Sequence, residues 1–149
     1  MLLTQLAIGS GMILVTAVIH TSGMVALIAH LMRSTALGRA DAHLERRRIA
    51  RFLAMTVLVV FLLHGFEIWV WAVLYQVLGE FDALSDALYF STVVFTTLGF
   101  GDVVLGPQWK LLSAMEASNG IILFGLSTAL LFAIFMRLIQ TNDLIERQP

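Results

Sequence analysis

The sequence contains no cysteine and few charged residues. Without cysteine the chain forms no disulfide and offers no thiolate as a metal ligand or nucleophile, and its redox compartment cannot be read from cysteine usage. Charged residues make up 13% of the chain and hydrophobic residues 59%, with a mean hydropathy of +0.90, whereas soluble domains are about 25% charged. These values indicate a membrane protein. The net charge of −1 gives no polybasic argument for nucleic acid.

Three long apolar segments follow one another along the chain. They cover residues 6–32, 52–78 and 111–136, and each exceeds the roughly 20 residues that a helix needs to cross the hydrocarbon. No basic residue precedes the first segment and its apolar run is too long for a signal peptide, so we expect a spanning helix. It has no regularly spaced arginines, which excludes a voltage sensor of the charged-helix kind.

The charges between these segments differ in sign. The polar stretch 33–51 carries six arginines against two acidic residues, whereas residues 79–110 carry four acidic residues and one lysine. By the positive-inside tendency the first stretch is cytoplasmic. We therefore expect a multi-pass protein of the plasma or inner membrane, with its N-terminus outside and its C-terminus in the cytoplasm. Trp69, Trp71 and Tyr75 are expected in the outer interfacial belt.

A shorter apolar run at residues 84–98 lies between the second and third spans. It is too short to cross the membrane and is followed by the polar sequence GFGD, which predicts a half-helix that dips in from outside and returns as irregular chain. We expect Asp82 or Ser85 to cap its start and Asp86 to lie in its first turn. Irregular backbone at membrane depth is tolerated only where protein buries it or where it lines a water-filled path.

The run Thr97-Leu98-Gly99-Phe100-Gly101 suits such a path. If the chain alternates between ordinary and left-handed conformations, successive carbonyl oxygens point to the same side, and glycine takes positive φ without a Cβ penalty. One strand offers too few oxygens to replace the water shell of an ion, so several copies around an axis are needed. The competing interpretations are a phosphate-binding loop, which requires a preceding strand, and a tight turn joining two membrane helices.

The run Thr96–Asp102, after the aromatic pair Tyr89-Phe90, resembles the pore signature T-T-V-G-Y-G-D of potassium channels. The resemblance covers residues 52–138 and implies a pore domain that assembles as a homotetramer. It implies a selectivity filter at Thr97, Leu98, Gly99, Phe100 and Gly101, with K⁺ at the first four, supported by Thr96, Asp102, Tyr89 and Phe90. Leu98 and Phe100 depart from the commonest Val and Tyr, and Phe100 lacks the hydroxyl that a tyrosine would use behind the filter.

One stripe of the third span consists of residues spaced by three or four: Ile121, Phe124, Thr128, Phe132 and Met136. Taken alone, this stripe is best explained by packing against the second helix. The resemblance instead implies that the first three residues line a cavity and that Phe132 or Met136 narrows the cytoplasmic mouth. Gly120 and Gly125 either bend this helix as a gating hinge or allow close helix packing.

Polar residues inside the spans require partners. Glu67 or Glu116 is expected to hold the half-helix through hydrogen bonds, in the protonated form if buried, and Glu67 could alternatively reach the interface beside Trp69. His64 and Glu67 share one helical face, but a metal site there needs a third ligand that the sequence does not reveal. His20, His30 and His43 are interpreted as structural residues.

Together these features predict an all-α membrane protein with three spanning helices, a re-entrant half-helix and a filter loop, assembling as a four-fold tetramer. Its regions are an N-terminal helix and basic loop (1–51), a pore domain (52–138) and a short tail (139–149). The predicted function is potassium-selective conduction, without catalysis or a cofactor other than the permeant ion. Its partners are lipids, monovalent cations and identical subunits. The alternatives are a non-selective cation channel, a non-conducting membrane scaffold, and a small metalloenzyme around His64 and Glu67.

Overall fold

The computed structural model describes residues 1–35 and 42–146, and within these ranges it contains helices and no strand. The helices are α1 (Leu2–Thr35), α2 (Ala42–Val77), α3 (Leu84–Phe95) and α4 (Lys110–Glu146). Three of them contain stretches long and apolar enough to cross a membrane, over Leu2–His30, Leu53–Val77 and Lys110–Met136. The three predicted spans and the predicted short helix, α3, are confirmed. The chain is a multi-pass membrane protein.

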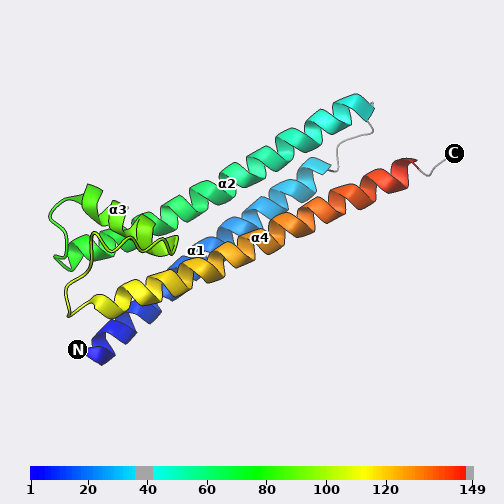
Figure 1. The fold of residues 1–149 in the computed structure, drawn as a ribbon. Helices are drawn as coiled ribbons and strands as arrows, with labels where there is room; N and C mark the ends of the chain where they lie inside the picture. The colour runs from blue at the N-terminus through cyan, green and yellow to red at the C-terminus, as the bar shows by residue number, and fades with distance from the viewer. Residues whose placement is uncertain (36–41, 147–149) are drawn as a thin grey trace.

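The three long helices form an elongated bundle, with α1 and α4 running in the same direction and α2 running against them (Figure 1). The hydrogen bonds from Leu111 to Gln5 and from Asn119 to Thr16 follow that parallel order. The N-terminus therefore lies at the same end of the bundle as α3 and its loops, and α4 ends at the opposite end (Figure 1).

A glycine closes α2 at the end of the bundle where α3 begins. Gly79 has a φ of 75°, its N–H donates to the Gln76 carbonyl at 3.0 Å, and the Glu80 N–H donates to the Tyr75 carbonyl at 3.1 Å. This pair of bonds is the Schellman arrangement, which satisfies carbonyls at a helix end. The Glu80 carboxylate in turn accepts a hydrogen bond from the Gly106 N–H at 2.6 Å. The end of α2 is thus fixed to the segment that leads into α4.

The main core joins α2, α3 and α4 around large side chains, which are Trp71, Tyr75, Phe90, Phe95, Leu105, Leu112 and Leu123. Trp71 and Tyr75 have no exposed surface, whereas Trp69 is 48% exposed. The prediction of an interfacial belt is therefore wrong for Trp71 and Tyr75, because both pack inside the protein. Their role is to support the short helix α3 rather than to face the membrane interface.

Close contacts attach α1 to the bundle. A Cβ added at Gly9 would collide with the Met115 side chain of α4, and one at Gly23 would lie 2.9 Å from Leu63 of α2. Lipid tails are as apolar as leucine side chains, so helices in a membrane associate through close packing at small residues and through hydrogen bonds. Both kinds of contact hold α1, which is an integral part of the bundle.

The basic stretch is mostly helical. α2 begins at Ala42, so the second half of the stretch 33–51 continues into the second span instead of forming a loop. Arg47 and Arg51 are exposed. Arg39 and Asp41 lie outside the described residues, as does the side chain of His43. At the other terminus α4 continues to Glu146, which makes most of the expected tail helical.

Gly120 determines how closely α3 approaches α4, since a Cβ there would collide with the carbonyl oxygen of Phe95. We expect Gly120→Ala to displace the end of α3 and to lower stability by about 1–3 kcal/mol, as overpacking does. Thermal unfolding in detergent measures this loss. Gly65→Ala is the matched control, because nothing lies within 4 Å of a Cβ at that position. Equal melting temperatures for Gly120→Ala and the parent protein would contradict the close contact.

Candidate functional site

The short helix α3 starts near one end of the bundle and stops inside it. It follows Ala83, whose backbone is extended (φ −104°, ψ 135°), and no side chain caps it. The predicted caps at Asp82 or Ser85 are therefore wrong, while Asp86 does lie in the first turn, where its charge complements the helix dipole. The last residue, Phe95, is fully buried. The Phe95 side chain therefore anchors the C-terminal end of α3, which carries a partial negative charge, against the core, while Val94 and Thr96 beside it are half-buried.

The chain reverses direction immediately after α3. Thr96 keeps an α-helical conformation with a φ of −80°, and Thr97 then adopts a φ of +61°. The Val93 carbonyl accepts hydrogen bonds from the N–H groups of Leu98 at 3.0 Å and Gly99 at 3.3 Å, which satisfies an oxygen that a helix end would leave free. From here the irregular chain returns to the end of the bundle where α3 begins (Figure 1).

Residues 97–101, which we call the strand although they form no β-ladder, have the alternating backbone that their sequence favours. φ is positive at Thr97 (61°), Gly99 (55°) and Gly101 (76°), and it is not positive at Leu98 or Phe100. Residues 97–102 are all exposed on the single chain. A left-handed conformation costs a residue with a Cβ about 1–2 kcal/mol, and within the described ranges Thr97 alone among non-glycine residues adopts one. Backbone strain of this kind concentrates at functional sites.

Of the aromatic pair before the strand, Tyr89 is exposed and Phe90 is buried. The Tyr89 hydroxyl donates to Asp102 Oδ2 at 2.7 Å, joining α3 to the end of the strand. This bond lowers the pKa of the Asp102 carboxyl below its ordinary value of 3.8 and raises the pKa of Tyr89 above 10.0. Phe90 is buried and meets the Tyr75 ring edge-on, with ring centroids 5.2 Å apart. The pair thus connects the strand on one side to the core on the other.

Behind α3, the fully buried carboxyl of Glu116 joins three helices. It accepts a hydrogen bond from the Tyr75 hydroxyl at 2.6 Å, and its other oxygen lies 2.5 Å from Ser91 Oγ. Ser91 Oγ also lies 2.9 Å from the Ile68 carbonyl oxygen. Glu116 therefore meets the expectation of a carboxyl that hydrogen-bonds to the half-helix.

The Ser91 hydroxyl has more acceptors within reach than it has hydrogens to donate. A serine hydroxyl has one hydrogen to donate, yet Ser91 Oγ lies within hydrogen-bond distance of two acceptors, the Ile68 carbonyl and Glu116. Both contacts are hydrogen bonds at the same time only when Glu116 is a carboxylic acid that donates to Ser91. A neutral acid also avoids burying an unpaired charge between membrane helices.

Glu67 has different partners. Its two oxygens lie 2.9 Å from His20 Nδ1 of α1 and 2.9 Å from His64 Nδ1 of α2, and its side chain has no exposed surface. The carboxylate therefore faces these histidines instead of α3, and it does not snorkel beside Trp69. Sequence reasoning missed His20 as a partner because 47 residues separate it from Glu67 and no local pattern connects them.

The stripe predicted on α4 is open on the single chain. Ile121, Phe124, Phe132 and Met136 are 36–64% exposed, and Thr128 is also exposed. Phe124 still touches its own chain, because its ring centroid lies 4.3 Å from that of His64 and 5.6 Å from that of Phe95. The stripe as a whole does not pack against α2, so the simpler interpretation of its spacing is wrong.

The two glycines of α4 have different surroundings. Gly120 lies against the Phe95 carbonyl, which matches the expectation of close helix packing, whereas nothing lies within 4 Å of a Cβ at Gly125. Both glycines lie inside one continuous helix.

The sequence matches a family model described as "Ion channel" over residues 56–137, which is more than half of the chain. The matched range contains α3, the strand 97–101 and most of α2 and α4. Comparison with curated proteins and with solved structures gives no match.

The Tyr89–Asp102 bond depends on pH. Because the pKa of Asp102 is lowered in the folded chain, the bond stabilises the strand at pH values above 3.8 and is lost as the pH falls through the lowered value. We expect Tyr89→Phe to move the Asp102 titration upward toward 3.8. The carboxyl ¹³C signal measures this shift, and Asp102→Asn identifies the signal. An unchanged titration in Tyr89→Phe would show that the bond does not form.

A protonated Glu116 carboxyl can be replaced by a side chain that makes the same hydrogen bonds. Glutamine can donate to Ser91 and accept from Tyr75 in the way a carboxylic acid does, so we expect Glu116→Gln to melt within a few degrees of the parent protein. Glu116→Ala leaves a cavity and an unpaired Tyr75 hydroxyl, while Ser91 still donates to the Ile68 carbonyl. It should lose about 2–4 kcal/mol. Thermal unfolding in detergent compares the two variants. Equal destabilisation by glutamine and alanine contradicts the neutral acid.

Proposed function

We propose that this chain, which belongs to the ion channel family, is one of four identical subunits of a potassium-selective channel in the plasma or inner membrane. The observation that supports this proposal most strongly is the alternation of φ over residues 97–101, placed directly after a half-helix whose end is buried. We assign the selectivity filter to these five residues.

The proposed selectivity comes from backbone oxygens. When consecutive residues alternate in handedness, their carbonyl groups can face one axis, and a ring of carbonyls replaces the water shell of a potassium ion. In our proposal the carbonyl oxygens of Thr97, Leu98, Gly99 and Phe100 bind K⁺, together with the Thr97 hydroxyl. The Tyr89–Asp102 bond holds the outer end of this strand, and the Glu116 contacts hold α3 behind it.

The exposure of the strand supports assembly around it. Leu98 is 59% exposed and Phe100 is 66% exposed on the single chain, and one strand has too few oxygens to surround an ion. Four strands around an axis would supply complete rings of carbonyl groups. They would also cover the backbone of residues 97–101, which a membrane does not accept unless protein or water covers it.

The helix α3 supports cation binding electrostatically. Its C-terminal carbonyls carry a partial negative charge equivalent to about half an elementary charge, and the buried Phe95 side chain fixes this end against the core. In a tetramer four such ends would face the region below the filter. A cation there would be stabilised at the depth where its desolvation costs most.

The exposed stripe of α4 provides the rest of the proposed pore. Ile121, Phe124 and Thr128 would line a cavity below the filter, and Phe132 or Met136 would narrow the cytoplasmic mouth. Apolar rings of this kind gate ion pathways by dewetting. In this orientation the N-terminus and the filter lie outside and the C-terminus lies in the cytoplasm, in accord with the six arginines of stretch 33–51.

A non-selective cation channel is the second candidate. It is favoured by Phe100, which lacks a hydroxyl with which to fix the filter from behind. A filter held less rigidly would distinguish K⁺ from Na⁺ less well.

Ion flux from vesicles that contain only the purified protein separates these functions. We expect flux under a potassium gradient and little under an equal sodium gradient. Comparable flux for both ions would instead show a non-selective channel. Absence of flux from an intact tetramer, across a range of pH and voltage, would show a non-conducting scaffold.

The filter assignment makes a prediction with a built-in control. Gly99→Ala places a Cβ at a φ of +55°, and Gly79→Ala places one at a φ of +75° outside the strand. Both changes should cost about 1–2 kcal/mol of stability because of the strained backbone. Only Gly99→Ala should abolish the preference for potassium in the vesicle assay. Unchanged preference in Gly99→Ala would remove residues 97–101 from the proposed pore.

A further inference from the structure

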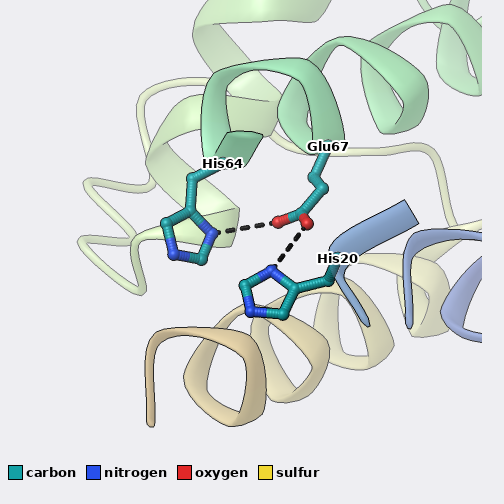
Figure 2. A group of neighbouring side chains, drawn as sticks. All are labelled: His20, His64 and Glu67. Atoms are coloured by element: carbon teal, nitrogen blue, oxygen red, sulfur yellow. Dashed lines mark hydrogen bonds and ion pairs between the residues drawn. The ribbon is translucent and has the colours of Figure 1, made fainter. Parts of the chain in front are cut away.

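Two histidines and one glutamate from different helices meet inside the bundle. Figure 2 shows the imidazoles of His20, from α1, and His64, from α2, turned toward the carboxylate of Glu67. Each Nδ1 lies 2.9 Å from a different oxygen of Glu67. His20 and Glu67 have no exposed surface, and His64 is 5% exposed. From these contacts we propose that His20, His64 and Glu67 form a binding site for a divalent transition metal, represented by zinc.

The ligand types favour zinc over the alkaline-earth cations. Imidazole nitrogen and carboxylate oxygen bind Zn²⁺ at about 2.0–2.2 Å, and three protein ligands leave a fourth position for water. Mg²⁺ and Ca²⁺ prefer sites built from oxygen alone. Two imidazoles and one carboxylate therefore define a site that discriminates against the divalent ions most abundant in cells.

The spacing requires a modest local rearrangement. Ligand atoms around a tetrahedral zinc lie about 3.3 Å from one another, given bonds of about 2.0 Å. The two nitrogen-to-oxygen distances of 2.9 Å are close to that value. One ligand atom from each of the three residues lies within 4.8 Å of the others, so the widest gap closes by at most about 1.5 Å. Rotation of two imidazole side chains supplies such a movement.

A serine of α4 contacts the outer nitrogens of both histidines. Ser127 Oγ, on α4, lies 3.0 Å from His64 Nε2 and 3.3 Å from His20 Nε2. A histidine that binds metal through one nitrogen usually donates its other N–H to a nearby acceptor, which orients the ring. One serine oxygen can accept both Nε2–H groups. The site therefore has three ligands and a shared outer acceptor, and an ion there would join α1, α2 and α4.

One ligand of the site lies beside the exposed stripe of α4. His64 is its least buried ligand, and the His64 ring lies 4.3 Å from that of Phe124, measured between centroids. Phe124 belongs to the exposed stripe of α4. The proposal for the metal does not depend on conduction, because it rests on the bundle of a single chain.

Metal binding to the full-length protein in detergent tests this proposal. After chelator treatment and dialysis, zinc is added, and elemental analysis and calorimetry give its stoichiometry and affinity. We expect one zinc per chain, no comparable binding of Mg²⁺ or Ca²⁺, and a tetrahedral visible spectrum when Co²⁺ replaces zinc. Absence of zinc binding by the folded protein overturns the proposal and leaves the proposed conduction untouched.

Variants locate the ion. His20→Asn and Glu67→Gln keep hydrogen-bonding groups in the cluster, and each should weaken zinc binding at least 100-fold. Ser127→Ala removes only the outer acceptor and should weaken it about 10–100-fold. His30→Ala is the control, since His30 is an exposed histidine of the same helix. Circular dichroism confirms that each variant is folded. Zinc affinity that is unchanged in folded His20→Asn and Glu67→Gln, or that is lost in His30→Ala, overturns the assignment.

Discussion

Backbone polar groups inside a lipid bilayer need partners, and this requirement governs the segment between α3 and α4. Backbone groups of this segment find their partners in different ways. Val93 accepts two N–H groups where α3 ends, and the Glu80 carboxylate accepts the Gly106 N–H near the start of α4. Between them, residues 97–101 alternate in handedness and remain exposed on the single chain. The N–H groups of Thr97, Leu98 and Gly99 donate to carbonyls of α3. The exposure of residues 97–101 is consistent with carbonyl groups whose natural partners are ions, water and identical strands.

The bundle serves this strand by holding α3 rigidly. Gly120 allows the Phe95 carbonyl to approach α4, and Glu116 is hydrogen-bonded to Tyr75 and Ser91 behind the helix. Hydrophobic burial drives little helix association in lipid, so close packing and buried hydrogen bonds carry that role here. The same principle applies to α1, which contacts the bundle through glycines and through polar side chains. The cluster around Glu67 is one of these buried polar contacts, and it has the chemistry to hold a metal.

Local sequence predicted the features that depend on neighbouring residues. Apolar length gave the three spans, and the spacing of Gly99 and Gly101 gave the alternating backbone. Features that depend on tertiary packing were not predictable in the same way. His20 meets Glu67 across 47 positions. The sequence around Trp71 is typical of the membrane interface, but its side chain is buried in the core. The missing cap at Ala83 has a similar origin, because contacts with α2 and α4 fix α3 without one.

The central claim is that four copies of residues 97–101 surround one axis and that their carbonyl oxygens bind potassium. An experimental structure of the purified assembly in potassium-containing buffer tests it most directly. The account predicts four-fold symmetry, with the strands 97–101 nearest the axis and ion density beside the carbonyl oxygens of Thr97 to Phe100. An assembly in which these strands face lipid, or lie away from any shared axis, would contradict it.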